Sequence, residues 1–160
     1  KVLKILVKNN DTYELIMVGD GPEKNLCVEW SERNNLSKYV QFVSANPEES
    51  VAYIIRSDIY LSTSLSEGAS NSLMEAASYG KPFVSTNTGN AADLQKSGIR
   101  GSIYKAGHVD AAAEHIRKFQ SLNVLEKNNI QKNNFSIMSD LFSYERVINR
   151  YIELYNNESE

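Results

Sequence analysis

Residues 64–82 read SLSEGASNSLMEAASYGKP, and this stretch indicates a strand-to-helix junction. Gly68 and the Ser-Asn-Ser cluster at 70–72 are typical of a loop that caps a helix. Gly80 followed by Lys81-Pro82 predicts that this helix ends and the next strand begins. A helix start collects free backbone N–H groups, which attract anions such as phosphate. The junction is therefore the first candidate for a binding site.

Short apolar runs and helical segments alternate on both sides of this junction. The expected strands are 14–18, 40–43, 59–62, 82–85 and 101–104, and the expected helices are 2–7, 23–33, 47–56, 70–79, 90–96 and 110–119. This alternation predicts an α/β fold with a doubly wound, Rossmann-like parallel sheet flanked by helices. Strand runs stop after Ser121, and an apolar stripe in the helical tail predicts a closing helix at 139–157. Ligands of such folds bind beyond the carboxyl ends of the strands.

Two carboxylates flank the predicted anion site. Glu67 lies in the loop before the helix, and Glu75 lies about four residues inside it, roughly 6 Å along the axis at 1.5 Å per residue. A diphosphate at the helix start would have its two substituents on opposite sides. One carboxylate could then accept hydrogen bonds from a ribose and the other from a hexose, which describes a pocket for a nucleotide sugar.

A structural alternative applies to the same residues. Ser72-x-x-Glu75 matches a capping box, in which Glu75 would bind a backbone N–H near Ser72 instead of a ligand. A paired-carboxylate hydrolase is a further alternative, although Glu75 inside a helix beside an anion site does not suit a scissile bond. Sequence spacing leaves the capping and ligand-binding interpretations open.

The segment from Glu67 to Glu75 resembles the E-x7-E region of retaining glycosyltransferase family 4, whose members have the two-domain GT-B fold. Flanking segments match that family in the same order, and they read VGDGP at 18–22, VQFV at 40–43, SDIYL at 57–61, KPFVS at 81–85 and TGN at 88–90. The resemblance extends from about residue 14 to residue 119, and more weakly through 142–144. The agreement in order makes it specific.

The resemblance implies that residues 1–160 form one C-terminal donor-binding domain, which is half of a GT-B enzyme. Glu75 would accept from the ribose hydroxyls, and Glu67, the catalytic residue, would position the transferred hexose and stabilise it. The nucleotide base would lie against the loop that contains Ala45 and Asn46. The diphosphate would be held by the backbone amides of Gly68, Ala69, Ser70, Asn71 and Ser72.

The resemblance also implies a metal-independent reaction without a cofactor, because helix N–H groups and basic side chains neutralise the departing diphosphate. Retention would follow from attack on the same face of the sugar. The Arg and Lys that contact the phosphates in this family belong to an earlier strand, which we expect, with the N-terminal acceptor domain, to lie outside the 160 residues. We therefore expect no turnover from these residues alone. Asn90 stands where many members have a second Gly.

The function implied is transfer of a hexose from a nucleotide diphosphate sugar to a glycan or lipid-linked acceptor in polysaccharide biosynthesis. The expected location is cytoplasmic, with peripheral membrane contact through the N-terminal domain. One alternative is a nucleotide-sugar epimerase of GT-B architecture. Another is a non-catalytic nucleotide-binding module in which Glu67 and Glu75 only cap and solvate a helix.

Composition excludes several other classes. Lys and Arg number 17 against 20 Asp and Glu, a net charge of −3 that argues against a nucleic-acid partner. No apolar run approaches the roughly 18 residues of a membrane span. Cys27 is the only cysteine, so an internal disulfide is impossible. His108 and His115 have no neighbouring ligand cluster in the sequence, and we expect no metal site.

Overall fold

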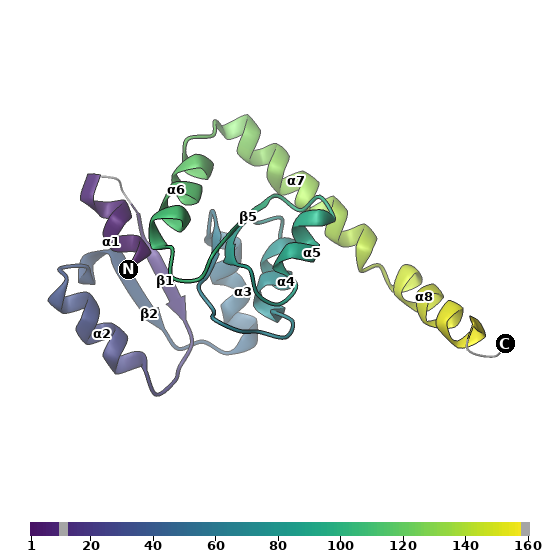
Figure 1. Cartoon of the computed structure of the whole chain (residues 1–160), viewed down its shortest axis with the longest axis horizontal. Helices are drawn as coiled ribbons and strands as arrows, with labels where there is room; N and C mark the ends of the chain where they lie inside the picture. Colours follow the sequence, from purple (N-terminus) through teal and green to yellow (C-terminus); the bar gives the residue numbers. More distant parts are fainter. Residues whose placement is uncertain (10–12, 158–160) are drawn as a thin grey trace.

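Five short strands alternate with helices in the computed structural model, which describes residues 1–9 and 13–157 (Figure 1). The strands are β1 (Leu15–Val18), β2 (Val40–Val43), β3 (Tyr60–Ser62), β4 (Phe83–Thr86) and β5 (Gly101–Tyr104). The helices around them are α1 (Val2–Leu6), α2 (Lys24–Arg33), α3 (Pro47–Arg56), α4 (Asn71–Ser78), α5 (Ala91–Lys96) and α6 (Val109–Gln120). Short 3-10 helices follow α1 (η1, Val7–Asn9) and precede β2 (η2, Ser37–Tyr39). Each strand expected from the sequence is present within one residue of its predicted bounds.

The five strands form two parallel ladders instead of one continuous sheet. β1 pairs with β2, and β4 lies between β3 and β5, all in parallel orientation. The predicted α/β class with helix-flanked parallel strands is confirmed. These strands do not form one continuous sheet, because within residues 1–9 and 13–157 one edge of β1 and one edge of β3 have no strand partner. Sequence periodicity predicts strands, but it does not predict which edges meet.

β4 is the centre of the core, and all four of its residues are buried. Its side chains alternate between two apolar clusters. Val84 packs with residues of α1 and α6 on one face, and Phe83 packs with residues of α4, α5 and α7 (Val124–Leu141) on the other. Gly101 is required on β5 because a Cβ there would lie 2.3 Å from the Phe83 ring. The best-covered strand therefore belongs to the ladder that follows the predicted binding junction.

The long helix α7 (Val124–Leu141) is fixed to this core by one buried asparagine. Asn134 is fully buried, and its Oδ1 accepts the Arg100 N–H at 2.7 Å. Its Nδ2 lies 3.3 Å from the carbonyl oxygen of Lys81 and 3.4 Å from that of Arg100. One side chain therefore satisfies the backbone in the turns that precede β4 and β5.

Lys81 connects the turn before β4 to α3. Its side chain is buried, and its Nζ donates at 2.7 Å to the carbonyl oxygen of Ile55 in the last turn of α3. Burial lowers the pKa of Lys81, and the nearby Asp58 carboxylate partly opposes that change. A cation at the carboxyl end of a helix also satisfies an otherwise unpaired carbonyl. The predicted structural role of the Gly80-Lys81-Pro82 segment agrees with this contact.

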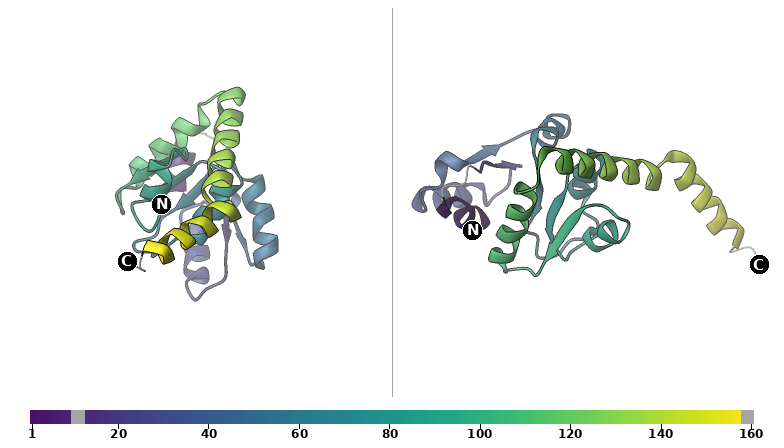
Figure 2. Two further views of the ribbon diagram at one scale, coloured as in Figure 1. Left: turned by 90° about the vertical axis from the view of Figure 1, so that its right-hand side faces the viewer. Right: turned by 90° about the horizontal axis from the view of Figure 1, so that it is seen from above.

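The last helix, α8 (Tyr144–Asn157), extends away from the body of the molecule (Figures 1 and 2). The predicted closing helix at 139–157 is divided, because residues 139–141 end α7 and α8 begins at Tyr144. Ser143 separates the helices, and its Oγ accepts the Arg146 N–H at 3.3 Å. None of the helices within residues 1–9 and 13–157 combines the length and apolar character that a membrane span requires.

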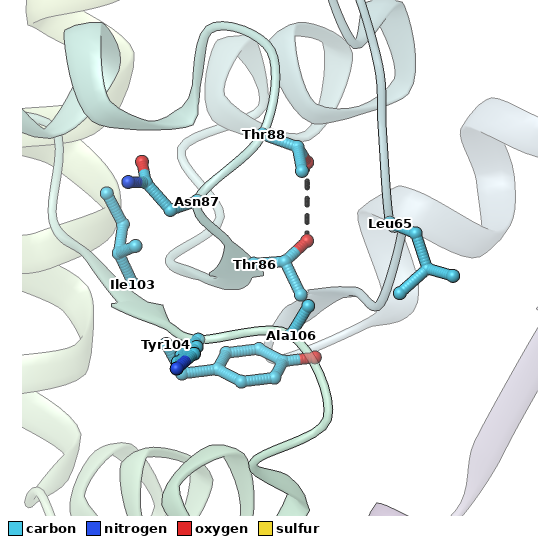
Figure 3. Close-up of a pocket in the computed structure, with 8 residues that line it drawn as sticks. Leu65, Thr86, Asn87, Thr88, Ile103, Tyr104 and Ala106 are labelled. Atoms are coloured by element: carbon cyan, nitrogen blue, oxygen red, sulfur yellow. Dashed lines mark hydrogen bonds between the residues drawn. The ribbon is translucent and has the colours of Figure 1, made fainter.

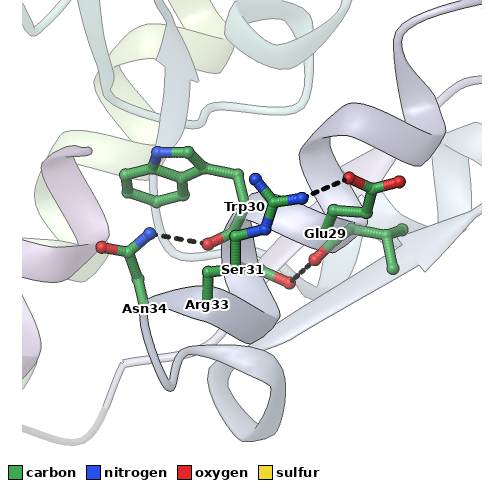
Figure 4. Close-up of polar contacts among 6 residues, drawn as sticks. Glu29, Trp30, Ser31, Arg33 and Asn34 are labelled. Carbon is green, nitrogen blue, oxygen red and sulfur yellow. Dashed lines mark hydrogen bonds and ion pairs between the residues drawn. The ribbon is translucent and has the colours of Figure 1, made fainter.

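Several polar contacts of α2 lie within its own turns (Figure 4). Arg33 pairs with Glu29 at 3.0 Å, Ser31 Oγ donates to the Val28 carbonyl at 2.7 Å, and Asn34 Nδ2 donates to the Trp30 carbonyl at 2.7 Å. Ser31 is its only buried residue. α2 is therefore poorly covered compared with α4, in which Leu73, Ala76 and Ala77 are buried.

Candidate functional site

The predicted junction is a loop, residues 63–70, followed by α4 at the carboxyl end of β3. Ser70 is the N-cap, and the first helical hydrogen bond runs from the Met74 N–H to the Ser70 carbonyl at 3.1 Å. The N–H groups of the three residues between them therefore have no partner inside the helix. Within the described residues no side chain accepts from them either, so the start of α4 offers free donors to an anion.

The space around Gly68 is open. A Cβ at this position would meet no protein atom within 4 Å, and the backbone at Gly68 does not have a positive φ. The protein fold itself therefore does not require glycine at residue 68. The open space is consistent with the expectation that a ligand approaches the backbone there.

Glu67 is half-buried in the same loop and is held by a serine. Ser64 Oγ donates to Glu67 Oε1, and the Ser64 carbonyl accepts from Thr86 Oγ1 at 2.7 Å. Thr86 is buried at the end of β4. Its hydroxyl holds the backbone of Ser64, and the hydroxyl of Ser64 in turn holds the carboxylate of Glu67. Among the described residues Glu67 Oε2 has no partner, and it can accept from a ligand hydroxyl.

β5 supports the chain two residues earlier, at the last residue of β3. The Tyr104 hydroxyl donates to the Ser62 carbonyl at 3.0 Å, and the side chain is buried. Burial raises the pKa of Tyr104 above its ordinary value, so the phenol keeps its proton and remains a donor at neutral pH. Neighbouring strands thus fix the end of β3 at the Ser62 carbonyl and the start of the loop at the Ser64 carbonyl.

The start of α5 contacts the loop from the side. Asn90 Oδ1 accepts the Ser70 N–H at 3.1 Å. Gly89 has φ of +56°, and a Cβ there would lie 3.0 Å from the Gly68 carbonyl oxygen. In the sequence, Asn90 is recognisable only as a departure from the family pattern, and the Ser70 N–H is one of the expected diphosphate donors. In the structure this N–H is already bonded to Asn90.

Glu75 lies on the exposed side of α4 and lines a shallow pocket of about 400 Å³. The pocket is also lined by Asn71, Met74, Ser78 and Tyr79. The capping-box interpretation of Glu75 is wrong, because Ser72 is the second residue of the helix and not its N-cap. Within residues 1–9 and 13–157 the Glu75 carboxylate has no hydrogen-bond or ion-pair partner, so it remains available.

A second pocket, of about 370 Å³, lies at the carboxyl ends of β4 and β5 (Figure 3). Thr86 and Thr88 face each other in it with their hydroxyl oxygens 3.2 Å apart, and Leu65 lies at its side. Its wall also includes Asn87 and Lys105. None of the residues predicted to bind a donor lines this pocket.

Ala45 and Asn46 lie between β2 and α3, in the other ladder. Asn46 is the N-cap of α3, and its Oδ1 accepts the Glu49 N–H at 2.8 Å while Glu49 Oε2 accepts the Asn46 N–H at 3.1 Å. This capping box occupies the side-chain oxygen of Asn46. Any contact of the loop with a nucleotide base would therefore use other atoms.

Acidic and histidine side chains do not gather elsewhere in the described part of the chain. Groups of three or more His, Cys, Asp or Glu residues that could hold a metal ion do not occur within residues 1–9 and 13–157. His108 is the N-cap residue of α6, and His115 lies within that helix.

Sequence reasoning located Glu67, Glu75 and the start of α4, but it missed the residues that hold them. Tyr104 was included only as part of the expected strand 101–104, and Thr86 lay one residue beyond the expected strand 82–85, since nothing local marks a hydroxyl that bonds a carbonyl 22 or 42 residues away. The signal for Asn90 was its replacement of glycine in the TGN segment.

Comparison with known proteins agrees with this geometry. The family model described as glycosyl transferases group 1 matches residues 1–136. The GPI3 subunit of phosphatidylinositol N-acetylglucosaminyltransferase from Saccharomyces cerevisiae is 25% identical over 162 residues, which cover 99% of this chain and 35% of the yeast protein. The chain thus spans about a third of the length of these curated yeast relatives.

Solved structures share the fold. A TarM variant from S. aureus, solved with Fondaparinux, alpha-GlcNAc-glycerol and UDP, superposes with a TM-score of 0.83 at 19% identity, covering 97% of this chain and 31% of TarM. The C-terminal domain of a glycosyl transferase group 1 family protein from Francisella tularensis gives 0.75 at 15% identity, covering 89% of this chain and 76% of that one.

Proposed function

Because the chain belongs to the family of glycosyl transferases group 1, we propose that residues 1–160 are the domain that binds the nucleotide-sugar donor of such an enzyme. The observation that carries the proposal is the start of α4, where backbone N–H groups without acceptors among the described residues fall in sequence between Glu67 and Glu75. Each of these two residues has at least one carboxylate oxygen without a partner among the described residues. A nucleotide diphosphate sugar has an anion in the middle and hydroxyl groups on both sides. Donors in the centre and acceptors on the flanks match that chemistry.

Each residue then has a distinct role. The amides of residues 68–69 and 71–72 bind the diphosphate, Glu75 accepts from the ribose, and Glu67 positions the hexose and stabilises charge that develops on it. The helix N–H groups replace a metal ion in neutralising the leaving diphosphate. In this proposal the reaction retains the configuration of the sugar, as in glycosyltransferase family 4. Backbone atoms of Ala45 and Asn46 border the base.

The substrate classes follow from relatives. The yeast relative is named for N-acetylglucosaminyl transfer and for phosphatidylinositol, and the TarM structure contains UDP. We therefore propose a uridine diphosphate hexose as donor and a glycan or lipid-linked acceptor, used in polysaccharide synthesis on the cytoplasmic side of a membrane. The epimerase alternative is not favoured, because the names of the relatives describe transferases.

The acceptor domain, in this proposal, lies outside these 160 residues. Support comes from the Francisella tularensis C-terminal domain, of which this chain covers 76%, and from the edges of β1 and β3 that have no strand partner among the described residues. We propose that the domain's first strand pairs at these edges and brings the basic residues that contact the phosphates. Residues 1–160 alone then bind donor but do not transfer sugar. If the domain instead belonged to a non-catalytic nucleotide-binding protein, the full-length protein would also fail to transfer sugar.

The test of the donor site is calorimetric titration of the protein with the diphosphates of uridine, guanosine, adenosine and cytidine. Glu75→Ala should weaken binding of the preferred nucleotide by about 1.5–3 kcal/mol, or roughly 10- to 150-fold, because a charged hydrogen bond is lost. The Glu75 carboxylate makes no hydrogen bond or ion pair among the described residues, so the melting temperature should hardly change.

Glu32→Ala is the matched control, since Glu32 is an exposed helical glutamate on α2. It changes charge and helix propensity in the same way but should leave nucleotide affinity unchanged. Equal affinities for the Glu75 and Glu32 variants would contradict the proposed ribose contact. A fall in stability without a fall in affinity would favour a purely structural role for Glu75.

A further inference from the structure

Asn90 has an unusual hydrogen-bonding arrangement. It is the N-cap residue of α5, where asparagine side chains commonly accept a hydrogen bond from their own helix, yet it makes no such bond. Its Oδ1 instead accepts the N–H of Ser70, the N-cap of α4, at 3.1 Å. The side chain is therefore diverted from the helix that it begins to the helix that forms the proposed site.

Gly89 brings Asn90 into this position. Its φ of +56° is a conformation that favours glycine, and a Cβ would lie 3.0 Å from the Gly68 carbonyl oxygen and 3.5 Å from both Glu67 Cβ and the Ser70 nitrogen. The Gly89-Asn90 pair thus lies close to the loop at Glu67 and Gly68 and is hydrogen-bonded to it at Ser70. These are the residues between which the diphosphate is proposed to bind.

The chemistry of an amide side chain determines what Asn90 presents to a ligand. Only Oδ1 can accept from the Ser70 N–H, so Nδ2 occupies the other position on the same carbon, beside the start of α4. Nδ2 has no acceptor among the described residues. Asn90 therefore takes one backbone donor of the site and offers two N–H donors of its own.

We propose that Asn90 is a donor-binding residue, whose Oδ1 fixes the Ser70 peptide and whose Nδ2 donates a hydrogen bond to the diphosphate of the nucleotide sugar. This inference rests on the proposed donor site. Asn90 is the residue at which this chain departs from the family pattern. In the proposed site its Nδ2, and not the Ser70 N–H, contacts the phosphate directly.

The decisive variant is Asn90→Asp, tested by UDP titration and thermal melting. Aspartate keeps an oxygen for the Ser70 N–H but puts a negative charge where the amide donated. A negative charge at a helix start is favourable, so the melting temperature should stay the same or rise. UDP affinity should fall by about tenfold or more, because the phosphate loses a donor and meets a like charge. Opposite changes in stability and affinity are not expected from a purely structural residue.

Two further variants make the test specific. Asn87→Asp introduces the same charge three residues earlier, on an exposed residue that lines the separate pocket, and should leave UDP affinity within about twofold. Asn90→Gly removes donor and acceptor without adding charge, so the expected loss is smaller, about three- to tenfold.

The outcomes separate the two proposals. If wild-type protein binds UDP and Asn90→Asp binds as tightly as Asn87→Asp, the inference is wrong and the donor site stands. A melting temperature that falls together with affinity in Asn90→Asp would also overturn it. Failure of wild-type protein and of Asn87→Asp to bind any of the four nucleoside diphosphates would overturn the donor site itself, and the role of Asn90 with it.

Discussion

The two ladders contain similar strands in different surroundings. β4 is buried along its whole length, whereas in β1, an apolar strand of the same length, Met17 and Val18 are each 40% exposed. β4 has a strand on each edge and a helical layer on each face, while β1 pairs only with β2 among the described residues. Apolar sequence alone therefore does not determine burial, which also requires neighbours on both edges.

Polar contacts differ in the same way. In α2 three side-chain bonds join residues three or four apart, and the two that reach distant residues, Lys24 to Ser44 and Lys4 to Asn34, are exposed. In and around the three-stranded ladder, Thr86, Tyr104, Asn90 and Asn134 bond residues 20 to 42 positions away. Long-range bonds to buried carbonyls and N–H groups hold one loop geometry, which a binding site needs. We infer that this half of the molecule is the pre-organised one, and three substitutions test the difference.

The largest effect is expected from Asn134→Ala. It would leave the Arg100 N–H and neighbouring carbonyls buried without partners, so the free energy of unfolding should fall by about 2–4 kcal/mol in urea titration. Asn133→Ala, at the exposed neighbouring position, is the control and should change it by less than about 0.5 kcal/mol. Similar losses in the two variants would remove the distinction between long-range and local contacts.

An intermediate effect is expected from Thr86→Val. The Ser64 carbonyl would lose its donor, and unfolding free energy should fall by about 1–3 kcal/mol. Ser31→Ala removes a hydroxyl of similar burial whose bond is local, so a change of only about 0.5 kcal/mol is expected. Denaturation of both variants in parallel measures the comparison. A larger loss for Ser31→Ala would reverse it.

The smallest effect at neutral pH is expected from Tyr104→Phe, about 0.5–1.5 kcal/mol for one hydrogen bond. Its pH dependence is more informative. Because burial raises the pKa of Tyr104 above 10.0, the unfolded chain releases this proton first as pH rises past that value. The folded protein then binds more protons, and its stability falls with rising pH until Tyr104 itself ionises. Chemical denaturation of Tyr104→Phe should show a shallower fall above pH 10.0, and parallel curves would contradict the burial of the phenol.

The sequence predicted the elements well where local signals act. β2, α3 and β5 have the predicted bounds, and Pro47 after the cap Asn46 explains the start of α3. The predicted bounds of the closing helix, 139–157, were wrong because α7 ends at Leu141 and α8 begins at Tyr144. The break at Ser143 does not disturb the apolar stripe on which the prediction was based. The split of the sheet depends on which edges meet, and edge pairing leaves no local pattern.

The same distinction applies to the site. Glu67 and Glu75 were recognisable because their spacing within one segment has a direct chemical meaning. The capping alternative for Glu75 could be rejected only after the N-cap was located at Ser70. Asn90 bonds a residue 20 positions earlier, so its contact with Ser70 appears only in the folded chain.

The central claim is that a nucleotide diphosphate binds at the start of α4. Backbone amide chemical shifts of isotope-labelled protein, recorded during titration with UDP, test it most directly. We predict that the largest changes fall on residues 67–72 and on the amides of Gly89 and Asn90, with α2 unaffected. Changes concentrated around Thr88 and Lys105, or no saturable changes with any nucleoside diphosphate, would contradict the assignment of the donor site.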